Sequence, residues 1–182
     1  MFFNKQSLVV GLLASMLTLA SACAATPESR STGQTVDDAG ISSKVKAALI
    51  KDHDTKANNI NVDVYQGKVK LAGFVGSAQE KAEATRIAKT VAGVQDVSNN
   101  LEVRAERTAG TAIDDGMITA KVKAALIGDS RTKAHQIDVN TNSGIVQLAG
   151  FVDDATAKSV AGDLAKAVNG VRSVRNELEV KK

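Results

Sequence analysis

The chain has 182 residues, a formal net charge of +3 and only 3% aromatic residues. The charge is evenly spread, because residues 36–103 are close to neutral and residues 113–182 carry about one excess positive charge. Dispersed charge and scarce aromatic side chains argue against nucleic-acid binding, which needs a concentrated basic stripe and rings for bases to stack on. The single cysteine, Cys23, excludes a disulfide within one chain.

The first 22 residues have the pattern of a signal peptide. Lys5 precedes an uncharged apolar run over residues 8–22, which is too short to span a membrane comfortably and ends in small residues. We therefore predict that residues 1–22 are removed and that the protein is exported to the periplasm. Two outcomes stay open: ordinary cleavage releases a soluble protein, or Cys23 is acylated at a lipobox-like site and anchors the mature lipoprotein in a membrane.

An internal repeat sets the domain organisation. Residues 36–103 recur as residues 113–180 at an offset of about 77, without gaps and with about half of the paired positions identical. A long period that occurs only twice indicates tandem domains rather than a solenoid. The predicted segments are a flexible tether at 23–35, domain 1 at 36–103, a linker at 104–112 and domain 2 at 113–182.

A helix is predicted at the start of each copy. Ile41, Val45 and Leu49 recur at helical spacing, and the second copy repeats this series. Asp37 and Asp38 precede the series and are candidate N-caps, because a carboxylate can accept the free N–H groups of the first turn.

A hairpin, a second helix and a third strand follow. Apolar residues alternate over residues 60–64 and 69–75, which predicts two strands joined by a turn. A capping signature and helical spacing cover residues 77–91, and alternation returns over residues 97–103. This order predicts an α+β fold with two tandem αββαβ domains, each a three-stranded mixed sheet with two helices on one face and the other face open.

Three positions in each copy have predicted structural roles. A glycine on the inward side of the second strand is expected where a helix backbone approaches too closely for a side chain. A second glycine is expected to end the second helix, and an inward asparagine of the last strand is expected to bond a neighbouring loop. In this order, the residues are Gly73, Gly93 and Asn99 in the first copy and Gly150, Gly170 and Asn176 in the second.

Three spaced motifs resemble the BON domain family. Both copies contain a Lys-Val-Lys-Ala-Ala-Leu helix, a Val-x-Leu-x-Gly-x-Val strand and a Val-x-Gly-Val-x-x-Val-x-Asn-x-Leu ending, in the same order. The resemblance covers nearly all of the predicted mature chain. It implies an αββαβ fold, residence in the bacterial envelope, association with membranes through phospholipid head groups, and a role under osmotic or envelope stress.

The sequence contains no recognisable catalytic or metal site. His53 and His135 have no partner at catalytic or metal-ligating spacing, and the paired acids at the helix starts are explained by capping. We therefore predict a protein that is not an enzyme and that uses no cofactor, metal ion or small-molecule substrate.

Differences between the copies point to a contact surface on the second. On the outward side of the second strand, Lys68 and Lys70 of the first copy are replaced by Ile145 and Gln147. Three interpretations of this more apolar face stay open: it binds a partner, it packs on domain 1, or its phenylalanine joins the core. The candidate residues for binding a membrane or partner are Ile145, Phe151, Lys121, Lys123, Lys158, Lys166, Arg172 and Arg175.

Two functions are compatible with these patterns. The first is an envelope protein that associates with anionic phospholipid surfaces and supports envelope integrity under osmotic stress. The second is a periplasmic chaperone or scaffold that holds envelope protein clients on its open sheet faces and free strand edges. For the first function, we expect the second copy to meet the membrane and the first copy to support it.

Overall fold

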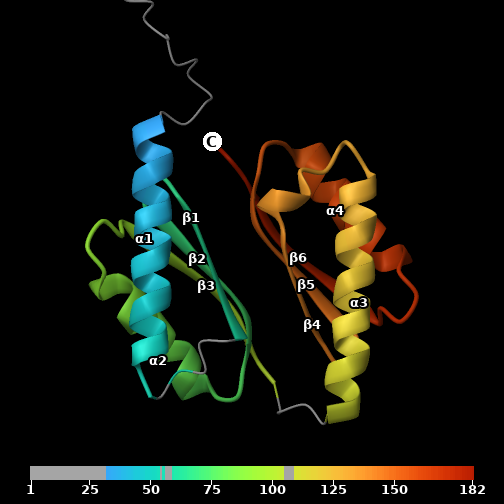
Figure 1. The fold of residues 1–182 in the computed structure, drawn as a ribbon, viewed down its shortest axis with the longest axis horizontal. Helices are drawn as coiled ribbons and strands as arrows, with labels where there is room; N and C mark the ends of the chain where they lie inside the picture. The colour runs from blue at the N-terminus through green and yellow to red at the C-terminus, as the bar shows by residue number, and fades with distance from the viewer. Residues whose placement is uncertain (1–31, 54, 56–58, 105–108) are drawn as a thin grey trace, which may run out of the picture.

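The computed structural model describes residues 32–53, 55, 59–104 and 109–182. The predicted signal peptide and Cys23 lie outside the described residues. The two copies of the repeat each form an αββαβ unit (Figure 1). Domain 1 contains α1 (Thr32–Lys51), β1 (Ile60–Tyr65), β2 (Lys68–Val75), α2 (Ala78–Thr90) and β3 (Asp96–Val103). Domain 2 contains α3 (Ala109–Gly128), the 3-10 turn η2 (Ala134–Gln136), β4 (Asp138–Asn142), β5 (Ile145–Val152), α4 (Ala155–Ala167) and β6 (Ser173–Val180).

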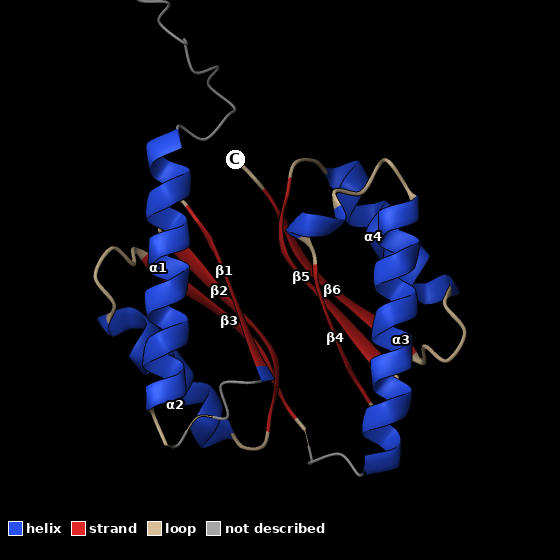
Figure 2. Ribbon diagram, viewed as in Figure 1, coloured by secondary structure: helices blue, strands red, loops and turns tan. Residues whose placement is uncertain are grey.

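Each domain has a three-stranded mixed sheet with its second strand in the centre. β2 pairs antiparallel with β1 and parallel with β3, and β5 pairs in the same way with β4 and β6. The parallel pair requires a crossover connection, which α2 and α4 supply. The helices lie on the outer sides and the two sheets face each other in the middle, giving four layers (Figure 2). The predicted α+β fold with two tandem mixed-sheet domains is confirmed.

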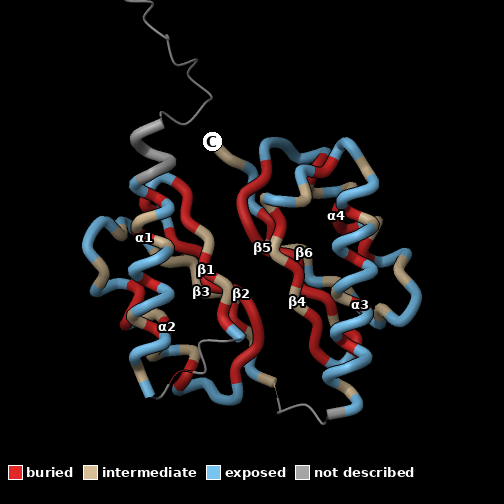
Figure 3. Tube along the Cα trace, in the orientation of Figure 1, coloured by how far each residue is buried: buried red, intermediate tan, exposed pale blue. Residues whose placement is uncertain are grey.

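Each core lies between one sheet and its own two helices. In domain 1, Val45 and Leu49 of α1 pack with Val69 and Leu71 of β2, and all four side chains are fully buried. Domain 2 repeats this cluster with the equivalent residues. The buried stretches run along the strands and along the inner sides of the helices, while the outer sides of the helices are exposed (Figure 3). The inward alternation therefore identifies the core correctly.

The helix aspartates anchor the hairpin turn rather than the start of the helix. α1 begins at Thr32, so Asp38 lies inside the helix, and its carboxylate accepts the backbone N–H groups of Gln66 and Gly67 at 2.9 Å each. Gln66 and Gly67 both have positive φ, as a two-residue hairpin turn requires. Asp115 does the same for the turn of domain 2, so the predicted capping role was wrong for both.

The glycines of the central strands leave room for a neighbouring loop carbonyl, not for a helix. A Cβ atom on Gly73 would lie 2.0 Å from the carbonyl oxygen of Asn59, and one on Gly150 would lie 2.2 Å from that of Gln136. Both glycines also have φ near +130°, a conformation that strains any other residue. The predicted close approach exists, but the approaching group is the segment that leads into the first strand.

The glycines predicted to end the second helices lie beyond the helix ends. α2 ends at Thr90 and α4 ends at Ala167, so each helix stops three residues before Gly93 or Gly170. Those glycines instead provide positive φ, at 94° and 100°, in the loop that follows.

The strand asparagines bond a helix rather than a loop. Asn99 donates to the carbonyl oxygen of Lys81 in α2 at 2.8 Å, and Asn176 donates to that of Lys158 in α4 at 2.7 Å. Each amide oxygen also accepts the backbone N–H two residues later, at 3.0 Å and 3.3 Å. The partly buried amides therefore tie the last strand to the second helix of the same domain.

The first helices start earlier than the predicted domain boundaries. α1 includes residues 32–35, which were assigned to the tether, and α3 includes residues 109–112, which were assigned to the linker. Polar composition and the lack of apolar periodicity suggested irregular structure there, but a helix whose later turns pack on a core can extend beyond them.

Candidate functional site

The outward faces of the two sheets are not open, because they cover each other. Lys70, Ala72 and Phe74 of β2 are 1%, 1% and 8% exposed. The equivalent residues of β5 are Gln147, Ala149 and Phe151, and they are 0%, 1% and 6% exposed. The predicted open face was wrong; of the three interpretations, packing on domain 1 is the one the structure has.

Polar contacts cross the buried centre of this interdomain interface. The Lys70 ammonium donates to the backbone carbonyl of Glu177 at 2.6 Å and pairs with the Glu179 carboxylate at 2.6 Å. The Gln147 side chain accepts the N–H of Gly73 at 2.7 Å and donates to the carbonyl of Asn100 at 2.6 Å. Two buried polar side chains, one from each domain, are thus satisfied by atoms of the opposite domain.

Two of the candidate binding residues belong to this interface. The Phe151 ring lies 5.4 Å from the Tyr65 ring and 5.5 Å from the Lys70 ammonium, and its backbone N–H donates to Asp63 at 3.2 Å. Arg175 forms an ion pair of 2.6 Å with Glu102 of domain 1. Phe151 is therefore unavailable to a membrane, and Arg175 is committed to domain 1. Ile145 is half-buried at the start of β5.

The solvent side of α3 carries an apolar stripe. Ile113, Met117 and Ile127 are 66%, 52% and 74% exposed. Ala120 and Ala124 are also exposed and fill the positions between them, so the spacing is four, three, four and three residues along the helix. The core side of α3 is formed by a different set of residues, including Val122 and Leu126. α3 is thus apolar on two opposite sides.

Cationic side chains border this stripe. Lys121 and Lys123 are exposed and lie on either side of it by helical geometry. Lys121 and Arg172 also line a hollow of about 590 Å³ beside the start of α3, together with Met117 and Asp114. Lys121 and Arg172 therefore lie beside the same hollow, and Lys123 lies on the opposite border of the stripe.

The two remaining lysine candidates lie on α4 instead. Lys166 is exposed, 3.7 Å from Asp163 of the same helix, and Lys158 is half-buried.

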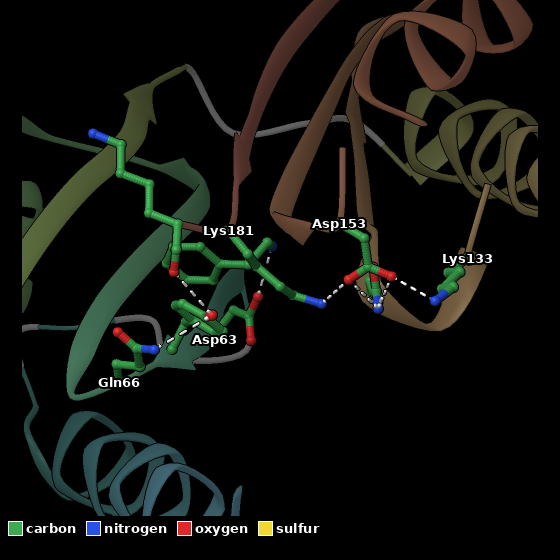
Figure 4. A network of polar contacts seen from close by, with 9 residues as sticks. Asp63, Gln66, Lys133, Asp153 and Lys181 are labelled. Atoms are coloured by element: carbon green, nitrogen blue, oxygen red, sulfur yellow. Dashed lines mark hydrogen bonds and ion pairs between the residues drawn. The ribbon is translucent and has the colours of Figure 1, made fainter. Parts of the chain in front are cut away.

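A charge cluster ties the end of the chain to the loop after β5. Asp153 accepts hydrogen bonds or ion pairs from Lys133, Lys181 and Gln136 (Figure 4). The Lys133 and Lys181 ammonium groups hold the pKa of the Asp153 carboxyl well below its ordinary value. The backbone N–H of Lys181 also donates to the carbonyl of Val152, so β6 is held at its far end. These contacts fasten the end of β6 to the loop after β5.

Asp138 has the opposite electrostatic environment. Burial raises the pKa of its carboxyl above the ordinary value, and Lys46 and Lys123 oppose this shift only in part. Since Lys46 belongs to α1 and Lys123 to α3, the side chain feels charges of both domains.

Among the described residues, no three histidine, cysteine or acidic side chains gather in a way that could hold a metal ion. Nor does the described part contain a helix with the length and hydropathy of a membrane span. His53 and His135 are both exposed.

The BON domain model matches residues 37–105 and 114–182, which are the two repeat units. This chain belongs to the BON domain family. The motifs that carried the resemblance correspond to α1, β2 and β3 in one BON domain and to α3, β5 and β6 in the other.

Several BON relatives resemble the chain over most of its length. It is 39% identical over 151 residues to "Osmotically-inducible protein Y" of Escherichia coli, with 82% of this chain and 75% of that protein covered. It is 36% identical to "Outer membrane lipoprotein DolP" of Haemophilus influenzae, with 80% and 75% covered. It is also 33% identical to a "21 kDa hemolysin" of Actinobacillus pleuropneumoniae, again with 80% and 75% covered.

Sequence reasoning missed the α3 stripe, although a signal for it exists. Met117, Ala120, Ala124 and Ile127 follow a heptad-like spacing, but the stronger series of Val122 and its neighbours occupies the same helix and explains it as a core element. A helix with a second apolar side contains more apolar residues than one core face needs, and that excess is the signal.

Proposed function

We propose that this BON protein is a non-enzymatic protein of the bacterial envelope that binds anionic phospholipid surfaces through the solvent side of α3. The observation that carries the proposal is the exposed apolar stripe from Ile113 to Ile127 between Lys121 and Lys123. A helix with an apolar side bordered by cations lies in the plane of a membrane interface, with its apolar side among the acyl chains.

Magnitudes show that several groups must act together. An exposed isoleucine gains about 2 kcal/mol when it is fully buried, and a lysine near an anionic surface contributes about 1 kcal/mol. Each term alone gives weak binding, but the stripe and its two lysines act from one side of one rigid helix. The α3 surface therefore supports reversible, peripheral attachment.

The names of the relatives support an envelope role. One relative is described as osmotically inducible and another as an outer membrane lipoprotein, so we assign this chain to the envelope and to the response to osmotic stress. The predicted signal peptide agrees with export to the periplasm. If Cys23 is acylated, the lipid anchor and α3 would provide the two membrane contacts that stable anchoring needs.

The chaperone alternative is less well supported by the fold. It relied on open sheet faces, and those faces bury each other in the interdomain interface. Of the surfaces on which it relied, the edges of the described strands β1, β3, β4 and β6 remain.

Vesicle flotation tests the proposal. The mature chain is mixed with vesicles of phosphatidylcholine alone or with 30 mol% phosphatidylglycerol. We expect binding to the anionic vesicles only, reduced about tenfold by Ile127→Ser and by the pair Lys121→Gln and Lys123→Gln.

The repeat offers a matched control for this experiment. Ile50 is the equivalent of Ile127 on α1 and is 68% exposed, but α1 has Gly40 and Ser43 where the α3 stripe has Met117 and Ala120. We expect Ile50→Ser to leave vesicle binding unchanged. Equal losses from both serine variants would rule out α3 as the membrane-binding side, and suppression of client aggregation without vesicle binding would favour the chaperone.

A further inference from the structure

Equivalent residues of the two copies meet at the interdomain interface. Asn100 of β3 and Glu177 of β6 occupy the same position in the repeat, and the Asn100 amide donates to the Glu177 carboxylate at 2.8 Å. Direct contact between equivalent residues places them on an approximate two-fold axis that relates the two sheets.

A second equivalent pair confirms this axis. Lys70 and Gln147 share a repeat position, and each reaches the backbone carbonyl of the other domain's axial residue. Lys70 donates to the carbonyl of Glu177, and Gln147 donates to the carbonyl of Asn100, both at 2.6 Å. The geometry is symmetric, although the side chains are not.

We propose that this interface is selective: the sheet face of domain 1 accepts the face of a domain 2 and rejects a copy of itself, and the reverse holds for domain 2. Two hypothetical pairs show why: two copies of domain 2, or two copies of domain 1, placed about the same two-fold axis. The partner that fits either face is thus the opposite domain, from the same chain or from a second copy of the chain.

Domain 2 rejects itself through a carboxylate. In a pair of two second domains, Glu177 would face another Glu177 at hydrogen-bond distance, where the structure has an amide donor. Glu179 would also lose the ammonium group of Lys70. Two half-buried carboxylates in contact repel each other, and neither can donate a hydrogen bond while ionised.

Domain 1 rejects itself through its buried lysine. The N–H of Gly73 needs the side-chain oxygen of Gln147, and a second domain 1 would present Lys70 there instead. An ammonium group has no acceptor, so a buried N–H would be left without a partner on each side of the axis. An interface is specific when unlike domains attract each other and like domains repel each other.

A charge exchange at the axis tests the selectivity in the full chain. Asn100→Glu places two carboxylates on the axis, Glu177→Asn leaves an amide pair there, and the double variant restores the original pair with its orientation reversed. The N–H of Gly73 and that of Phe151 bond across the interface, so their hydrogen exchange reports closure of the two domains. Amides within α2 serve as internal controls.

We expect N100E to speed exchange at Gly73 and Phe151 by about tenfold without changing exchange in α2. It should also lower the melting temperature by roughly 4 °C. E177N should have little effect, and the double variant should return both measurements close to those of the unmodified chain. The proposal is overturned if N100E exchanges like the unmodified chain, or if the double variant is no better than N100E.

Discussion

The first helices of the two domains share a core side and differ on the solvent side. Ile118, Val122 and Leu126 of α3 repeat the buried residues of α1 without change of type. On the outer side, α3 has Met117 and Ala120 where α1 has Gly40 and Ser43. The core contacts are shared because both domains need them to fold, so the core does not explain the two more apolar residues on the solvent side of α3.

The largest effect should come from a position that both domains share. Gly73→Ala and Gly150→Ala each put a Cβ atom about 2 Å from a loop carbonyl oxygen at a φ near +130°. We expect each to lower the free energy of unfolding by about 4 kcal/mol in urea titrations followed by circular dichroism.

Gly40→Ala is the control for these two variants. A Cβ atom there would meet nothing within 4 Å, so we expect the helix to gain up to about 1 kcal/mol. If one of the strand glycines tolerated alanine, the two domains would not share this constraint.

A smaller effect is expected at the aspartates that anchor the hairpin turns. Asp38→Asn and Asp115→Asn keep the shape of the side chain but replace one of two charged acceptor oxygens with an amide donor. We expect a loss of about 2 kcal/mol from each in the same titrations. Asp37→Asn, at the exposed neighbour, should change stability by less than about 0.5 kcal/mol. Equal losses at Asp37 and Asp38 would restore the helix-capping interpretation.

Acid should affect the stability of the two domains differently, because the Asp153 cluster belongs to domain 2. Domain 1 has Gly76 at this position. Since the folded pKa of Asp153 lies below its ordinary value of 3.8, the ionised group adds stability above that pH, and this contribution disappears as the pH falls through the folded pKa. We expect Asp153→Asn to lower the melting temperature by roughly 2 °C at pH 7, since the partly exposed site is screened by solvent.

The difference between D153N and the unmodified protein should shrink below pH 3.8 and vanish in stronger acid. Asp163→Asn is the control, because its pair with Lys166 is exposed and 3.7 Å long. A difference that stayed constant with pH would mean that the Asp153 carboxylate acts through packing rather than charge.

The smallest change in stability is expected for a variant of α1 that should gain membrane binding. Transferring part of the stripe to α1, with Gly40→Met and Ser43→Ala, adds exposed apolar groups and strengthens helix propensity. We expect stability to change by less than about 1 kcal/mol and anionic vesicle binding to rise several-fold in flotation. Unchanged binding would show that an apolar helix surface is not sufficient.

Local patterns predicted most of the fold. Alternation in β2 and β5 identified the core residues, and Gly73 was recognised as a place of close approach. The approaching group was misidentified, because spacing along one strand carries no information about which segment crosses it. Asp38 was assigned to a helix cap for a similar reason: a local rule explained it, while its true partners lie 28 and 29 residues away.

The candidate site was harder to predict than the fold. Lys70 on an outward strand position indicates a solvated face, and only the pairing with Glu177 and Glu179 in another domain makes its burial favourable. Lys121 and Lys123 lie on the exposed surface of α3, as predicted, but the stripe between them was missed because two of its five residues are alanines. Contacts between domains leave little trace in the periodicity of either domain.

The asymmetry of Lys70 and Gln147 also bears on the order in which the chain is made. Domain 1 precedes domain 2 in the chain and leaves the ribosome first, so its sheet face is uncovered until domain 2 has been synthesised. Lys70 puts a charge in the middle of that face, and a charge on an uncovered strand face opposes β aggregation. Domain 2 is synthesised when the opposite face is already present, and its equivalent position has the neutral Gln147.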